Sequence, residues 1–339
     1  MKLAWRGFQG VPEWSVLGFL LLGICWHAQA QSCQTASEID AASKSGIQTT
    51  AQRYFDMAAK GDAASLRQNA IPSLASDFAG IEGTIKENQP NLAGVQATIK
   101  SFFLLDASGA APIPNAEFYC GVFGKNGQTA NSAAFYLNNL PPAKYAVVIL
   151  DATSSAGRTM FSEILQQVGT DWKLGGLYIK AAQIAGHDSN WYLTRAREYK
   201  TKGQAHNAWF YYEEARSLIS PLPFMSTLAT DNLYDESQNL QPTDIPSGGK
   251  TTDLPAGGVT YKVMAVFPQA VEKDLDLIVR YQSANVANTN LAYQDNVAVM
   301  KAVLQKWPEL REAFAGVVAR AVDASGRDYG TLLAMKDIK

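Results

Sequence analysis

Histidine and cysteine are scarce in this chain, with three of each among 339 residues. Beyond residue 30 only His187, His206, Cys33 and Cys120 remain, and they lie far apart in the sequence. A transition-metal site draws three or four ligands, some of them closely spaced, from histidine, cysteine and carboxylates. The sequence therefore predicts no metal site.

Motifs for nucleotide binding and covalent catalysis are also missing from the sequence. It contains no Gly-x-Gly-x-x-Gly after a strand, no phosphate-binding loop with lysine and no Gly-x-Ser-x-Gly nucleophile elbow. His187, Asp188 and Ser189 are the residue types of a catalytic triad, but sequence neighbours point in different directions. We interpret Asp188 or Ser189 as a helix cap, and the sequence predicts no cofactor and no catalytic residue.

An excess of positive charge is absent. The chain has 29 basic and 31 acidic side chains, a formal net charge of −2, and no basic run. Nucleic-acid binding depends on clustered lysine and arginine that release counterions from phosphates. We therefore expect no nucleic-acid partner.

Long apolar runs are absent except for residues 16–26. This run is shorter than the roughly 20 residues that a membrane span needs. It follows Lys2 and Arg6 and precedes the small-x-small sequence at residues 28–30, which is the pattern of a cleaved export signal. We predict that residues 1–30 are a signal peptide, and that the mature protein is periplasmic or secreted with no membrane span.

Two alternatives to a cleaved signal stay open: an apolar core helix, and a lipid anchor at Cys25 or Cys33. The bulky Ile24 directly before Cys25 and the polar Gln31 two residues before Cys33 argue against lipid attachment at either cysteine. After cleavage Cys33 and Cys120 remain, and in an oxidising compartment they could form a disulfide. The alternative is a buried free Cys120 and a Cys33 in a disordered segment.

Residues 31–45 are polar and rich in serine and alanine, and we interpret them as a leader. Residues 46–182 begin with helical spacing and then change to a period of two, which is typical of strands. The expected helices lie at residues 47–58, 63–69 and 72–87, and the expected strands at 98–105, 117–123, 133–137, 145–152, 159–168 and 172–180. This order predicts an α+β fold with helices against one face of a curved antiparallel sheet.

Residues 46–182 resemble the NTF2-like, or cystatin-like cone, superfamily. The resemblance is carried by the helix end DMAAKGD at residues 56–62 and by the closing hairpin at residues 161–178. It implies an apolar pocket between helices and sheet, where some members place a carboxylate and a tyrosine for proton transfer.

The polar groups expected nearest to such a pocket are Tyr54, Asp56, Asp77 and Tyr119, together with Glu117. Strand alternation argues against the last two of these. It puts Phe118 and Cys120 on the core face and leaves Glu117 and Tyr119 in solvent.

Residues 183–240 predict a helical hairpin with a further helix at 223–240. The hairpin resembles a single tetratricopeptide helix pair, through Tyr192, Ala196, Tyr199, Gly203, Ala208, Tyr212, Ala215 and Pro221. Because a lone pair cannot bury its own apolar face, we expect it to brace the first domain. Three further aromatics are candidate partner-binding residues, with core packing as the alternative: Trp191, Trp209 and Tyr211.

Proline and glycine pairs mark residues 241–258 as a linker. Residues 259–339 then predict a ββαββ domain. The segments 187–192 and 307–314 are similar to exported bacterial proteins of the same two-part design, a resemblance that implies architecture and no activity.

From these observations we expect a non-catalytic exported binding or envelope-associated interaction protein. Its partner would be a protein or a small apolar ligand. The alternative is a small-molecule enzyme of isomerase or hydratase type that uses the NTF2-like pocket.

Overall fold

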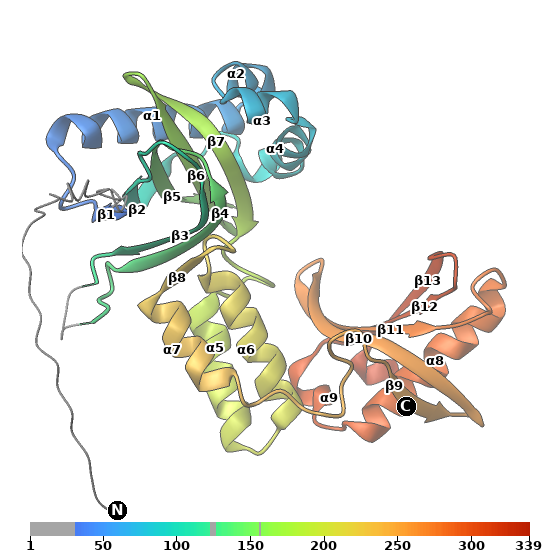
Figure 1. Ribbon diagram of the computed structural model, residues 1–339. Helices are drawn as coiled ribbons and strands as arrows, with labels where there is room; N and C mark the ends of the chain where they lie inside the picture. Colours follow the sequence, from blue (N-terminus) through green and yellow to red (C-terminus); the bar gives the residue numbers. More distant parts are fainter. Residues whose placement is uncertain (1–30, 123–126, 156) are drawn as a thin grey trace, which may run out of the picture.

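The structure is a computed structural model that describes residues 31–122, 127–155 and 157–339 (Figure 1). The predicted signal peptide, residues 1–30, lies outside the described residues. The rest is an α+β fold with three sheets and a central helix pair.

The helical opening consists of α1 (Ala41–Ala59), α2 (Ala63–Gln68), α3 (Pro72–Ser76) and α4 (Ala79–Leu92). The side chain of Asp40 caps α1 by accepting from two backbone amides of its first turn. Buried residues of α1 recur at helical spacing, among them Ile47, Ala51 and Phe55. The helix ends before Gly61, whose φ of 72° suits glycine.

The predicted polar leader is partly ordered structure. Residues 32–35 form strand β1 (Ser32–Thr35), which pairs with β2 (Ala97–Asp106), and α1 begins at Ala41 rather than near residue 46. A disulfide joins Cys33 to Cys120 with their Cα atoms 4.9 Å apart. This bond and the pairing with β2 hold in place a segment whose composition alone suggested a loop.

All six predicted strands of the first domain are present, but they form two sheets rather than one. Sheet A has the order β1-β2-β5-β6-β7, with β5 (Lys144–Ser154), β6 (Gly157–Val168) and β7 (Asp171–Ala181). Sheet B has the order β3-β4-β8, with β3 (Ile113–Cys120) and β4 (Ala133–Leu140). The structure therefore supports the α+β class and does not show an NTF2-like cone.

Sheet A lies between two apolar layers. The residues that pack with α1 and α4 include Phe102, Val148 and Phe161. The opposite face packs against the inner face of sheet B, for example through Phe103, whose ring meets that of Phe135 edge to face at 5.3 Å. The strands of sheet A thus have two buried faces, while sheet B has one.

The predicted hairpin is α5 (Ser189–Thr201) and α6 (Ala205–Ile219), joined through Gly203 with a φ of 75°. The predicted helix at residues 223–240 is in fact two elements, the short strand β8 (Met225–Thr227) and α7 (Leu228–Ser237). Strand β8 returns to the first domain and pairs with β4 in sheet B. The ammonium of Lys180 on β7 donates to the carbonyl of Ser220 at the end of α6, at 2.7 Å.

The C-terminal unit has the predicted order of β10 (Val259–Val271), β11 (Asp274–Gln282), α8 (Thr289–Lys306), β12 (Gly316–Val322) and β13 (Asp328–Ala334). It adds β9 (Thr252–Ala256), inside the predicted linker, and the short helices α9 (Leu310–Ala313) and η2 (Met335–Asp337). Its sheet, sheet C, has the order β13-β12-β11-β10-β9, and only β11 and β12 are parallel.

The core of the C-terminal unit continues into the hairpin. Tyr199 and Phe210 of the helix pair belong to the same apolar cluster as Val279 and Phe314. We expected the hairpin to brace the first domain. The structure instead shows that its aromatic side packs on the C-terminal unit, while β8 and Lys180 connect it to the first domain.

Candidate functional site

The four residues expected at an NTF2-like pocket do not come together. Asp56 and Asp77 are exposed, and Tyr119 lies on the outer face of sheet B. Tyr54 is buried beneath α1, and its hydroxyl donates to the carbonyl of Trp172 at 3.0 Å. Burial raises the pKa of Tyr54. Its phenol is therefore neutral, and its hydrogen bond links α1 to β7.

A different acidic residue, Glu163 on β6, occupies the interior between helices and sheet. It is fully buried, and neither carboxylate oxygen has a hydrogen-bond partner among the described residues. Its cross-strand neighbours are Val148 and Leu177, both part of the apolar cluster that includes Phe55. Burial raises the pKa of Glu163 well above its ordinary value, because ionising a carboxyl without a partner in apolar surroundings is costly.

Sequence analysis missed Glu163 although the signal was present. Strand alternation places it on the same face as Phe161 and Leu165, the apolar residues two positions to either side. A carboxylate between two core residues of a strand is the pattern that should have marked it.

Two pockets lie elsewhere in the described structure, and Glu163 lines neither of them. One, of about 290 Å³, lies beside α4 and is lined by Gly61, Ala63, Glu82, Ile85, Lys86 and Gln89. The other, of about 180 Å³, lies where the loop after β7 meets the turn between β10 and β11 (Figure 1). We call the latter the seam pocket.

The seam pocket contains two of the three predicted partner-binding aromatics. Trp191 is half-buried and stacks on His187 with ring centroids 3.7 Å apart, and Tyr211 lines the pocket from α6. Lys273 and Asp274 lie at the opposite wall. The third predicted residue, Trp209, is buried elsewhere, beneath the guanidinium of Arg216.

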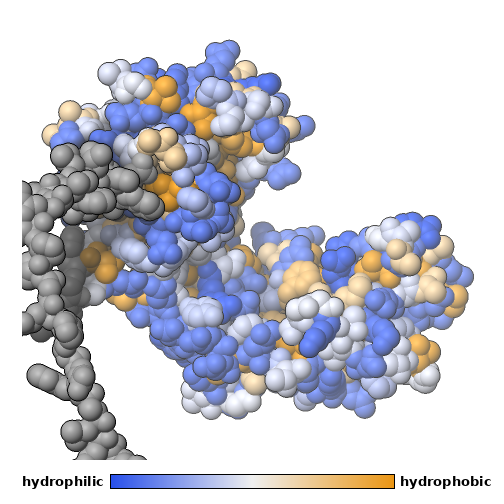
Figure 2. Space-filling view, in the orientation of Figure 1, coloured by the Kyte–Doolittle hydropathy of each residue, from blue (hydrophilic) through white to orange (hydrophobic). Residues whose placement is uncertain are grey.

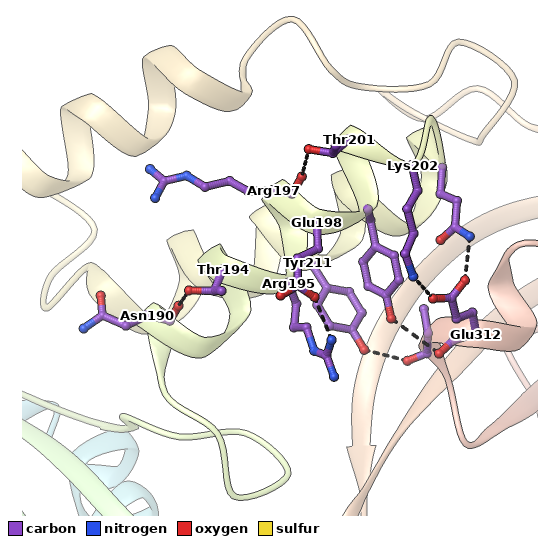
Figure 3. A network of polar contacts seen from close by, with 12 residues as sticks. Asn190, Thr194, Arg195, Arg197, Glu198, Thr201, Lys202, Tyr211 and Glu312 are labelled. Carbon is purple, nitrogen blue, oxygen red and sulfur yellow. Dashed lines mark hydrogen bonds and ion pairs between the residues drawn. The ribbon is translucent and has the colours of Figure 1, made fainter.

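The hydroxyls of the hairpin tyrosines mainly form hydrogen bonds within the molecule. The hydroxyl of Tyr211 donates to the carbonyl of Ala313 at 2.6 Å, and that of Tyr199 donates to the carbonyl of Glu312 at 3.4 Å (Figure 3). The carboxylate of Glu312 also accepts from Lys202 and Gln204. These bonds secure α9 to the helix pair and leave the phenols little contact with solvent.

His206 of α6 also lies where the hairpin meets the C-terminal unit, between two carboxylates. Its Nδ1 is 2.6 Å from Glu309 and its Nε2 is 2.9 Å from Asp244. The indole of Trp307 also donates to Asp244 at 2.6 Å. Asp244 belongs to the predicted linker, so this segment is attached to both the hairpin and the C-terminal unit.

Two exposed aromatic rings lie next to each other on the outer face of sheet B. Tyr119 of β3 is 53% exposed, Tyr136 of β4 is 49% exposed, and their rings meet edge to face at 6.3 Å. Phe224, just before β8, pairs with Tyr136 through a backbone hydrogen bond of 3.0 Å. Its ring lies 5.8 Å from that of Tyr178 on β7, which is 39% exposed. We call these four residues the tyrosine face.

Strand register produces the tyrosine face. On β3, Phe118 and Cys120 point into the core, so Tyr119 and Glu117 point outward, as the alternation predicted. The phenol of Tyr119 donates to the carboxylate of Glu117 at 2.6 Å, and this bond raises the pKa of Tyr119 to about 12. The ring therefore stays neutral at physiological pH.

Figure 2 shows one face of the molecule, coloured by hydropathy. Hydrophobic residues reach that surface in small groups separated by hydrophilic ones. In the ranges that the structure describes, no helix is long and apolar enough to cross a membrane. No group of three or more metal-binding side chains is found in those ranges either.

Compared with known proteins, the chain matches no family model, no curated protein and no solved structure. The NTF2-like and tetratricopeptide-like resemblances therefore stay predictions. The Cys33–Cys120 disulfide bears on location, since such bonds persist in oxidising, extracytoplasmic compartments.

Proposed function

We propose that this is an exported, non-catalytic binding protein whose interaction surface is the tyrosine face of sheet B. The observation that carries the proposal is a series of aromatic residues: the ring pair of Tyr119 and Tyr136, the backbone pairing of Tyr136 with Phe224, and the ring pair of Phe224 and Tyr178. Tyrosine is favoured at interfaces because it provides a large, stiff contact area and a polar tip at little entropic cost.

The contrast with the inner face of the same sheet supports the proposal. Phe118, Phe135 and Met225, which alternate with the outward residues, are all buried against sheet A. The core is therefore filled without the exposed rings. Large rings left in solvent on a surface that packing does not require are a mark of a binding site.

The disulfide supports the exported location and the rigidity of this surface. It ties β3, which carries Tyr119, to β1 at the edge of sheet A. A binding surface held by a covalent cross-link loses little freedom when it meets its partner.

Hydroxyl-radical footprinting of the mature protein tests the proposal. The protein is exposed to the envelope fraction of the cells from which it is purified, and oxidation of individual tyrosines is measured. We expect Tyr119, Tyr136 and Tyr178 to be protected, and the exposed Tyr293 of α8 to react as in the free protein. Protection confined to other surfaces, or none at all, would exclude the tyrosine face as the interaction surface.

A second candidate function, a small-molecule enzyme of isomerase or hydratase type, is favoured by Glu163 alone. Its unpartnered carboxyl lies between helices and sheet, where the NTF2-like resemblance implies a pocket. A raised pKa would suit a general acid or base near neutral pH. This candidate requires a path for substrate to Glu163, and solvent accessibility of Glu163 measured by carboxyl labelling of the native protein is its test.

A further inference from the structure

From the groups that surround the tyrosine face we infer that its ligand is an uncharged oligosaccharide or polysaccharide. This inference deepens the proposed function and rests on it. It comes from the outward residues that lie beside the four rings on the same surface of sheet B.

The register of sheet B identifies these residues. Asn115 of β3 pairs with Asn138 of β4, and both are exposed. Glu117 pairs with Tyr136, and Ala134 pairs with Ser226 of β8. Because directly paired residues share a face, side-chain amides lie on one side of Tyr136 along the strands and a hydroxyl lies on the other.

The amides are available to a ligand. Within the described part of the chain, the side chains of Asn115 and Asn138 make no hydrogen bond to another residue, while each amide offers two donors and an acceptor. A sugar presents many hydroxyls that need donors and acceptors alike. It also presents C–H groups that pack on the electron-rich faces of aromatic rings.

The charges of this surface argue against an anionic ligand. Glu117 is acidic, and Ser226 donates to Asp231, a second carboxylate. The ammonium of Lys180, two residues after Tyr178 on β7, donates to the carbonyl of Ser220. A phosphate-rich or sulfated polymer would meet repulsion here, and a neutral glycan would not.

The dimensions suit an extended chain molecule. The row crosses β3, β4 and the segment before β8, then reaches β7. Adjacent strands of sheet B lie about 4.8 Å apart, and the ring of Tyr178, on sheet A, lies 5.8 Å from that of Phe224. From Tyr119 to Tyr178 the row is therefore on the order of 15 Å long. A ligand of several sugar units would contact all four rings, and a single sugar would contact one or two. We therefore expect affinity to rise with oligosaccharide length.

The test uses cellohexaose, maltohexaose and chitohexaose as probes, with binding to the mature protein followed by NMR titration. We expect at least one probe to bind, with an affinity at least tenfold lower for the corresponding disaccharide. The Tyr119→Ala, Tyr136→Ala double variant should lose binding at least tenfold. Tyr293→Ala, a matched change at an exposed tyrosine of α8, should bind as the unmodified protein does.

Three outcomes would overturn the inference. They are no binding of any hexasaccharide, equal binding by the double variant, and salt-sensitive binding of poly-lysine in place of the neutral sugars. Circular dichroism of the double variant confirms that it is folded. If footprinting shows protection of the tyrosine face by an envelope protein while all sugars fail, the glycan inference falls and the proposed function stands.

Discussion

The two aromatic-rich regions of this protein use tyrosine in opposite ways. On the hairpin, Tyr199 and Tyr211 are buried and their hydroxyls bond to backbone carbonyls of α9. On sheet B, Tyr119 and Tyr136 are half in solvent, and the hydroxyl of Tyr119 donates to Glu117, which is itself exposed. The hairpin tyrosines join two parts of one molecule, and we propose that the sheet B tyrosines face outward to join a second molecule.

The comparison teaches that aromatic density in the sequence does not locate a binding surface. Residues 191–212 hold the densest cluster of aromatics, and the structure uses most of it as core. The tyrosine face draws its members from four separated segments. Its signal is therefore spread over the chain, where no local pattern marks it.

The strongest way to break the comparison is to truncate one tyrosine of each kind. Tyr211→Ala should lower the free energy of unfolding by about 4 kcal/mol, because it removes a buried ring and leaves a cavity. Tyr136→Ala should change it by no more than about 0.5 kcal/mol. Urea unfolding of both variants measures the difference, and similar losses would mean that Tyr136 is also part of the core.

The next test concerns the disulfide of the first domain. Reduction of the disulfide, which closes a loop of 87 residues, should lower the free energy of unfolding by about 3 kcal/mol. A Cys33→Ala, Cys120→Ala double variant should start from the lower value and not respond to reductant. Hydrogen exchange should then show faster opening of β1 and β3, with β11 and β12 unchanged. Equally faster exchange in β11 and β12 would contradict the expectation that the disulfide stabilises the first domain alone.

The smallest expected effect comes from Glu163, the buried acid of the first domain. Since folding raises the pKa of Glu163, the folded state holds this proton more tightly than the unfolded state. Its contribution is complete below the ordinary carboxyl pKa and is lost as pH rises toward the folded pKa, at up to about 1.4 kcal/mol per pH unit. Glu163→Gln should remove this part of the pH dependence.

Glu214, on α6 of the hairpin, is the buried acid that corresponds to Glu163 of the first domain. Burial, together with neighbouring Glu213, raises its pKa to about 7, so it also weakens folding as pH rises from about 4.5 to above 7. Because Glu214 is present in both proteins, the difference in urea stability between the unmodified chain and Glu163→Gln isolates Glu163. Parallel pH profiles would show that Glu163 has a partner or solvent access.

Much of the secondary structure could be predicted because its signals are local. Alternation with a period of two located the strands of the first domain, and the C-terminal element order followed from the same rule. The same alternation correctly placed Phe118 and Cys120 inside and Tyr119 outside. These inferences need only a residue and its near neighbours in the sequence.

The arrangement of the strands could not be predicted, because it depends on pairs far apart in the chain. The division into two sheets requires that β5 pair with β2 across the intervening β3 and β4 hairpin. It also requires that β8, which looked helical, pair with β4. The candidate site could not be predicted for the same reason, since Phe224 is brought beside Tyr136 and Tyr178 by contacts between segments far apart in the chain.

The position of β8 sets a condition on how this protein matures. The first domain needs residues 225–227 to complete sheet B, and these residues follow the whole hairpin. A polypeptide that emerges amino-terminus first can complete sheet B only after both hairpin helices have emerged. Any fragment cut between β7 and β8 would leave the β4 edge unpaired and open to association with other chains.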